Sequence, residues 1–314
     1  MKEKNNLRAV GKGSLASSIA ANKYMYLLLT PAVICVFIFG YAPLCGLLLA
    51  FKDYDALLGF AKSPWVGLKN IRNIFAFPNF IKAIKNTLIF SSVCLFGQFP
   101  FPIILAIMLS EVRNKAFKKI SQTVTYLPHF LSWISVVGFA YTLFALHGPF
   151  NNIMASIFGD SYERTNILLD SKNFLSFIFF SGLWKEMGWN SIIYLAAIAG
   201  IDQSLYEAAA IDGAGRLKQI WHITLPSIRT TAVLVLIMNI GSLVTSNFEQ
   251  VYGFQNVYTQ TDTEVINTLV YREGIQNGEY SMATAFGLVQ GLVSLTLVMT
   301  ANKISRKLSG EAIW

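Results

Sequence analysis

The chain has 314 residues, of which 54% are hydrophobic and only 13% are charged. Charged residues make up about 25% of a typical soluble domain, so this composition excludes a soluble globular protein and indicates an integral membrane protein. The formal net charge of +8 does not indicate nucleic-acid binding, because the basic residues are scattered over short segments and form no aromatic-lined stripe.

Six apolar segments follow a basic N-terminal tail over residues 1–23. A helix of about 20 apolar residues crosses the roughly 30 Å hydrocarbon core of a bilayer, and the segments are of about that length or longer. We therefore predict an all-α membrane domain over 24–302 and a second tail over 303–314. The predicted spans are 24–51, 83–110, 126–147, 174–199, 230–250 and 281–302.

The distribution of Lys and Arg predicts the orientation of these spans. Segments assigned to the inside hold 15 of these residues, against 9 in the outer segments. Because basic residues concentrate on the cytoplasmic side, both termini are predicted to be cytoplasmic and the chain to be a multi-pass protein of the plasma membrane. Most of the outer basic residues lie in 52–85, where an amphipathic helix on the membrane surface is expected.

A polar loop over 200–229 separates the fourth and fifth spans. The Ala-rich stretch from Ser204 to Ile211 favours a helix, and Asp212-Gly213 favours a turn, because glycine tolerates left-handed backbone. A second helix is predicted from Arg216 to Thr224. Pro226 lacks a backbone N–H and disfavours helical geometry at the residue before it, so Leu225 is expected to be extended and to end this helix.

The spacing within this loop resembles the cytoplasmic signature of binding-protein-dependent ABC importer permeases. The pattern E-A-A, three residues, G, and later I-x-L-P is filled by Glu207, Ala208, Ala209, Gly213, Ile223, Leu225 and Pro226. The resemblance implies a type I ABC importer permease fold with six transmembrane helices, and a coupling helix that docks into a cleft on a separate ATPase. The implied coupling residues are Glu207, Ala208, Ala209, Asp212, Gly213 and Ala214. An ordinary amphipathic loop is the alternative.

The same resemblance implies the partners. They are a second, homologous permease subunit that forms a heterodimer with this chain, two cytoplasmic ATPase subunits and an extracellular solute-binding lipoprotein. The chain itself has no nucleotide-binding motif, so ATP and Mg are expected on the ATPase subunits, and neither a cofactor nor a catalytic site is expected here.

The fourth predicted span carries Trp184-Lys185-Glu186-Met187-Gly188-Trp189-Asn190. Ionisable residues inside a membrane normally face a bundle interior or a watery cavity. Trp184, Glu186, Trp189 and Asn190 are therefore candidates for a translocation pathway in which rings stack on sugars and polar groups bind hydroxyls. Lys185 and Glu186 are expected to point about 100° apart and not to neutralise each other. A structural ion pair with another helix is the alternative.

Asn247-Phe248-Glu249-Gln250 is predicted to close the fifth span on the outer side. Together with Tyr271-Arg272-Glu273-Gly274 and Thr284-Ala285-Phe286-Gly287, it resembles the polysaccharide-permease branch of maltose-type carbohydrate importers in Gram-positive-type bacteria. This resemblance implies an oligosaccharide or glycan fragment as substrate and adds Glu249 and Gln250 to the pathway. A solvated interfacial charge is the alternative for Glu249.

Two other functions remain open. A permease of the same architecture could carry a non-sugar solute such as an amino acid. A membrane-embedded enzyme is disfavoured, because the sequence has no H-E-x-x-H, no nucleophile elbow and no clustered intramembrane carboxylates.

Overall fold

The computed structural model describes residues 22–241, 243–244 and 247–309, and this part of the chain is helical. Its only strand-like pairing among the described residues is an isolated bridge between Lys52 and Trp65. The predicted all-α class is confirmed. The longer elements are α2 (Lys23–Val36), α5 (Pro78–Gln98), α6 (Pro100–Glu111), α7 (Lys115–Tyr126), α8 (Trp133–Leu143), α9 (Pro149–Phe158), α10 (Ser171–Ala199), α11 (Gln203–Ile211), α14 (Arg229–Ile240) and α18 (Tyr280–Ser309).

Three helical segments in the described chain are long and apolar enough to cross a membrane: Lys23–Phe51, Pro78–Glu111 and Tyr280–Lys307. Two further pairs of helices reach that length only if each pair is counted as one bent span, and the bends are 97° and 55°. Length and composition therefore support three to five spans. The predicted first, second and sixth spans coincide with the three long segments. Most of the tail 1–23 lies outside the described residues.

The third predicted span, 126–147, is wrong as a continuous helix. The chain bends by 97° between Lys115–Phe130 and Trp133–Leu143. Pro128 lies in a short 3-10 turn, η3 (Leu127–Phe130), and cannot donate a backbone hydrogen bond. Ser132 then starts a new helix, because its hydroxyl oxygen accepts from the backbone N–H of Ser135 at 3.2 Å.

The fifth predicted span, 230–250, is interrupted as well. Helix α14 ends at Ile240, and a separate helix, α15 (Phe248–Phe254), begins after it. Asn247 caps α15, since its side-chain oxygen accepts from the backbone N–H of Gln250 at 3.3 Å. The segment 247–250 therefore opens a new helix and does not close the fifth span, because a capping side chain favours a helix start.

The segment 52–77, which was predicted to lie outside, forms two short helices, α3 (Gly59–Lys62) and α4 (Lys69–Ile74), and not the single amphipathic helix that was expected. The ammonium of the buried Lys52 donates to the carbonyl of Phe60 at 2.6 Å and lies 5.3 Å from the ring centre of Trp65. The Asn70 amide donates to the carbonyls of Ala50 and Lys52. These contacts fold the segment back on itself, so no long helix forms.

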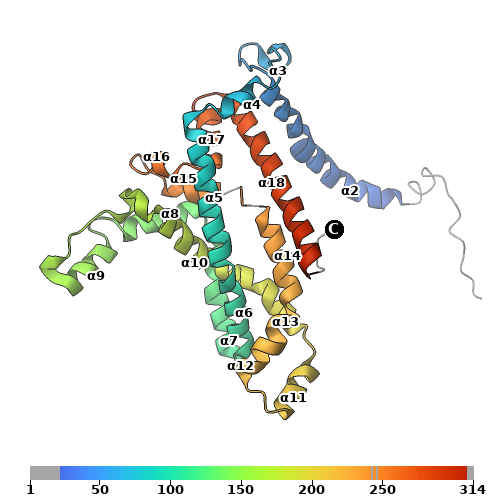
Figure 1. The fold of residues 1–314 in the computed structure, drawn as a ribbon, viewed down its shortest axis with the longest axis vertical. Coiled ribbons are helices and arrows are strands. Elements are labelled where there is room, and N and C mark those ends of the chain that lie inside the picture. Colours follow the sequence, from blue (N-terminus) through green and yellow to red (C-terminus); the bar gives the residue numbers. More distant parts are fainter. Residues whose placement is uncertain (1–21, 242, 245–246, 310–314) are drawn as a thin grey trace, which may run out of the picture.

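Two apolar clusters hold the long helices together. One joins the end of the first helical segment to α4, α5, α17 (Ile266–Tyr271) and α18, and the other joins α5, α8, α10 and α15. Figure 1 shows α5 and α18 side by side in the half of the molecule that carries α3, and the pair α11 and α12 (Arg216–Gln219) at the opposite end. Helix α2 lies apart from the rest and buries no residue.

Candidate transport cavity and coupling loop

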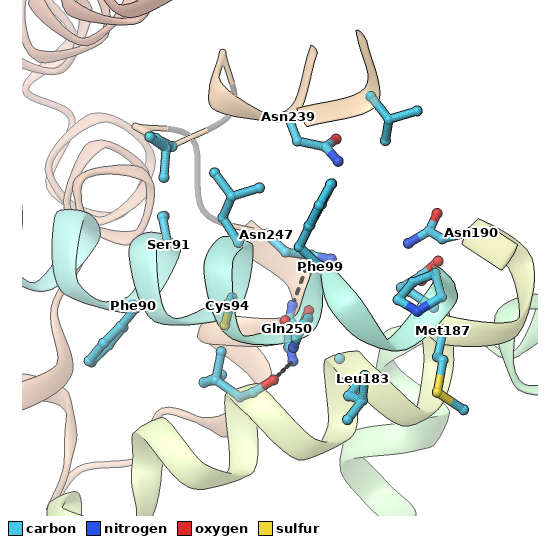
Figure 2. Close-up of a pocket in the computed structure, with 18 of the residues that line it drawn as sticks. Phe90, Ser91, Cys94, Phe99, Leu183, Met187, Asn190, Asn239, Asn247 and Gln250 are labelled. Carbon is cyan, nitrogen blue, oxygen red and sulfur yellow. Dashed lines mark hydrogen bonds between the residues drawn. The ribbon is translucent and has the colours of Figure 1, made fainter. Parts of the chain in front are cut away.

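A cavity of about 270 Å³ lies between α5, α6, α8, α10, α14 and α15. Figure 2 shows side chains from these facing elements converging on it. The lining combines aromatic rings with side-chain amides, the mixture that small-molecule sites use to hold and orient a polar ligand. The polar and aromatic lining residues are Phe90, Ser91, Gln98, Phe99, Trp133, Glu186, Asn190, Tyr194, Asn239, Asn247 and Gln250.

Backbone contacts hold two of the amides in place. The buried Gln250 amide donates to the carbonyl of Ile178 at 2.8 Å and to the hydroxyl of Ser181 at 3.0 Å (Figure 2). The Gln98 amide donates to the carbonyl of Phe179 at 2.7 Å. Gly182 makes this arrangement possible, since a Cβ atom there would lie 2.9 Å from Nε2 of Gln98. Both amides are thereby fixed against α10.

Lys185 and Glu186 form an ion pair, contrary to the sequence expectation. The Lys185 ammonium lies 3.2 Å from Glu186 Oε1 and donates to the carbonyl of His129 at 2.7 Å. The other oxygen, Glu186 Oε2, lies 2.7 Å from Nδ1 of His129. Adjacent positions diverge at the backbone, but both side chains are long enough to reach the same point on η3. Glu186 thus also contacts another helix, as the alternative interpretation expected, through a hydrogen bond with His129 on η3.

The structure brings together only some of the residues proposed for the pathway. Glu186, Asn190 and Gln250 line the cavity, whereas Trp184, Trp189 and Glu249 do not. Trp189 stacks on His129 with ring centres 4.3 Å apart and planes 4° apart. Trp184 remains half exposed, and Glu249 is exposed on α15.

Sequence reasoning missed His129 and Trp133. His129 contacts Lys185, Glu186 and Trp189. Trp133 lines the cavity, and its ring lies 5.3 Å from the Lys185 ammonium. Pro128 was the sequence feature that could have pointed to these residues. A proline marks a possible break in a helix, and at such a break the polar side chains of η3 can contact α10.

Gly188 allows α10 to lie close to α7 and η3, which form the first arm of the bent pair Lys115–Leu143. A Cβ atom at this position would lie 2.0 Å from the carbonyl oxygen of Thr125 on α7. Because no such contact is tolerated, only glycine allows α7 and η3 to lie this close to α10. Gly188 therefore supports the contacts of His129 with Lys185 and Glu186.

The loop 200–229 forms the predicted helix, turn and helix. Asp202 caps α11 by accepting from the backbone N–H of Ser204 at 2.9 Å, and this bond holds the pKa of the Asp202 carboxyl below its usual range. At the other end, the N–H of Ala214 donates to the carbonyl of Ala209 at 2.8 Å, and the N–H of Gly213 to Ala210 at 3.1 Å. Gly213 has φ +76°. This is a Schellman motif, whose left-handed position favours glycine.

The second helix of the loop continues further than predicted. Leu225 has helical backbone, with φ −62° and ψ −45°, so the expectation that it is extended is wrong. A π-helical turn, η6 (Ile220–Thr224), leads into α13 (Leu225–Ser227), and Pro226 is the second residue of α13. The chain bends by 55° only after Ser227.

Large apolar side chains of this loop are uncovered. Ile211 is 87% exposed, Leu217 83% and Trp221 70%. They lie on both helices of the loop, at the end of the molecule marked by α11 and α12 in Figure 1. Two polar contacts brace the loop: the Tyr206 and Thr224 hydroxyl oxygens are 2.9 Å apart, and Arg216 lies 3.4 Å from Glu111 at the end of α6. These contacts hold the two helices of the loop together and tie the loop to α6, while its large apolar side chains stay exposed.

An all-α membrane protein with an internal cavity and a braced helical loop at one end has the features of an importer permease. Residues 98–308 match the family described as binding-protein-dependent transport system inner membrane component. The chain is 42% identical to Protein LplB of Bacillus subtilis (strain 168), over 97% of this chain and 95% of that protein. It is also 42% identical to the polygalacturonan/rhamnogalacturonan transport system permease protein YteP of the same organism, over 96% and 93%.

The fold agrees with this match. The crystal structure of a bacterial ABC transporter involved in the import of the acidic polysaccharide alginate superposes with a TM-score of 0.85 at 38% identity, covering 94% of this chain and 99% of that one. A second structure is the crystal structure of the bacterial alginate ABC transporter in complex with an alginate pentasaccharide-bound periplasmic protein. It superposes with a TM-score of 0.86 at 36% sequence identity, covering 95% of this chain and 99% of that one. The chain belongs to the family of binding-protein-dependent transport system inner membrane components.

Proposed function

We propose that the chain is the permease subunit of an ATP-driven importer that translocates a carbohydrate, an oligosaccharide or glycan fragment, delivered by an extracellular binding protein. The observation that carries this proposal is the pairing of an amide- and aromatic-lined cavity with family membership. Amide groups both donate to and accept from hydroxyls, and aromatic rings pack on the CH faces of sugars. The names of similar proteins, which mention polygalacturonan, rhamnogalacturonan and alginate, support a carbohydrate over an amino acid.

Energy for transport is supplied by partners in this proposal. Glu207, Ala208, Ala209, Asp212, Gly213 and Ala214 form the coupling element, and the exposed Ile211, Leu217 and Trp221 fill a cleft on an ATPase subunit. Exposed apolar clusters of this kind mark protein interfaces. Two such ATPase subunits hold the ATP and Mg, a second homologous permease completes the pathway, and a solute-binding lipoprotein delivers the substrate. In this proposal the chain itself carries out no catalysis.

The proposed layout has six spans with both termini in the cytoplasm. The three long segments account for three. Each bent pair contributes one more through its second helix, Trp133–Leu143 or Arg229–Ile240, while its first helix lies at the cytoplasmic side. Helix α10, which has 29 residues, is the sixth. Its Lys185 and Glu186 are paired and packed against η3 or face the cavity, which is how ionisable residues are accommodated inside a membrane. Residues 1–23 and 303–314 are the cytoplasmic tails.

The function is tested by uptake. Cells that lack this chain should fail to accumulate labelled glycan fragments that wild-type cells import, and a plasmid copy should restore the uptake. An amino-acid mixture serves as the control. Chain-dependent loss of amino-acid uptake, with glycan uptake intact, would identify the rival solute class.

The layout is tested by labelling single cysteines from outside intact cells. Positions in 147–173 and 250–280 should react with a membrane-impermeant maleimide, whereas positions in 111–125 and 204–226 should react only after the membrane is permeabilised. Reaction near Lys218 in intact cells would contradict the six-span orientation.

A further inference from the structure

The charges of the side chains that line the cavity indicate which kind of glycan, neutral or acidic, this chain accepts. Family membership does not indicate this. Among the described residues that line it, Glu186 is the only Asp, Glu, Lys or Arg. The remaining polar lining consists mainly of five amides, from Gln98, Asn190, Asn239, Asn247 and Gln250. The described wall of the cavity therefore presents amide groups and no cationic side chain.

Nearby cations are already engaged. Lys185 is buried, lies against Trp133, and gives its ammonium hydrogens to Glu186 and to the carbonyl of His129. On the outer side, Lys82 of α5 lies 2.8 Å from Asp262, and Arg272 pairs with the buried Glu264. No ammonium or guanidinium of these residues is left to face a carboxylate in the cavity.

We infer that this half of the pathway is built for an uncharged glycan and discriminates against uronate-rich chains. A uronate carries a carboxylate on each sugar residue, and a carboxylate that leaves water needs a cation or several charge-directed donors in exchange. Here it would meet amides and a Glu186 carboxylate that already holds the Lys185 ammonium, so no free cation compensates the lost water. A neutral sugar meets amide groups, which can donate to and accept from hydroxyls.

This inference rests on the proposed carbohydrate function and departs from what the relatives suggest. Two of them bear names that mention polygalacturonan or the acidic polysaccharide alginate. Fold and family are shared with them, but selectivity is decided by the side chains at the cavity wall. The prediction is thus specific to the lining of this chain.

The first measurement compares neutral and acidic glycans in intact cells. A mixed plant and bacterial polysaccharide hydrolysate is separated on an anion exchanger, and each fraction is fed to cells with and without this chain. Chain-dependent depletion, followed by mass spectrometry, should favour the neutral fraction by about tenfold or more. Preferential depletion of the acidic fraction would overturn the inference and leave the carbohydrate function standing. Depletion of neither would overturn both.

The second measurement assigns the discrimination to the cavity and not to the binding protein. Asn190→Lys places a cation at the wall, and Asn190→Gln is the matched neutral control. The lysine variant should lower the neutral-to-acidic uptake ratio by about tenfold, while the glutamine variant keeps the wild-type ratio. An unchanged ratio in the lysine variant, at normal amounts of assembled complex, would place selection outside the cavity and overturn the assignment.

The reactivity of Cys94 can report on ligand binding in the cavity. Cys94 lines the cavity, and the other two cysteines, Cys35 and Cys45, are exposed on the first helical segment. In a variant with Ser at positions 35 and 45, the neutral fraction should slow alkylation of Cys94 in the assembled transporter, and the acidic fraction should not. Protection by the acidic fraction alone would contradict the inference.

Discussion

Gly213→Leu is expected to abolish energised transport while the protein still inserts into the membrane. Gly213 holds the left-handed position of the Schellman motif with φ +76°, and a residue with a Cβ atom costs about 1–2 kcal/mol in that conformation. Within the chain, a Cβ atom here would meet nothing within 4 Å. The leucine side chain therefore points into space that the proposed ATPase cleft would occupy.

A series at this position separates backbone strain from obstructed docking. Gly213→Asn tolerates left-handed backbone and is the matched control, Gly213→Ala adds strain with little bulk, and Gly213→Leu adds both. Uptake and co-purified ATPase, each normalised to inserted protein, should decrease in the order Asn, Ala, Leu. Equal losses for Ala and Leu would leave strain as the whole cause. Wild-type uptake by the leucine variant would refute the coupling role.

The second large effect is expected at Glu186, and it should appear first as a loss of assembled complex. Glu186→Gln removes the carboxylate that pairs with the Lys185 ammonium, whose side chain is 6% exposed. A buried charged group that loses its partner costs about 1–3 kcal/mol, toward the lower end here because the Glu186 side chain is 31% exposed. Trp189→Ala, which removes the stacking on His129, should act in the same direction.

Asn190→Ala should behave differently, because Asn190 lines the cavity and is exposed within this chain. The amount of complex should persist, and uptake per complex should fall roughly threefold to tenfold, the value of one lost hydrogen bond to substrate. Trp184→Ala is the comparison, since Trp184 does not line the cavity and should change neither quantity. A fall in normalised uptake for Trp184→Ala, with none for Asn190→Ala, would move the pathway to the other side of α10.

Local chemistry was sufficient to predict the helix, turn and helix of the loop 200–229, except at Leu225. The Ala-rich stretch and Asp212-Gly213 specify the first helix and the turn through bonds between near neighbours, and these are the bonds observed. The helical class and the three long apolar segments were predictable for a related reason. A run of apolar residues in a membrane has to satisfy its backbone groups internally, so it becomes a helix without help from its neighbours.

The interruptions and the cavity depended on contacts between distant residues. Pro128 and Asn247 were visible in the sequence, but a proline or a capping residue marks a possible break, and packing decides whether the chain bends there. The partners of Glu186 illustrate the point. Its neighbour Lys185 was judged out of reach from helix geometry alone, and His129 lies 57 positions away, so their meeting depends on the bend after η3 and on Gly188 beneath it.

What the sequence by itself determined was therefore the membrane class, the long helical segments and the helix, turn and helix of the loop 200–229, each set by residues close together in the chain. The tertiary structure alone decided that Glu186, Asn190 and Gln250 share one cavity while Trp184, Trp189 and Glu249 do not. The physical reason is that a helix exposes side chains around its whole circumference, and only the packing of α5, α8, α14 and α15 around α10 selects which of them face the cavity.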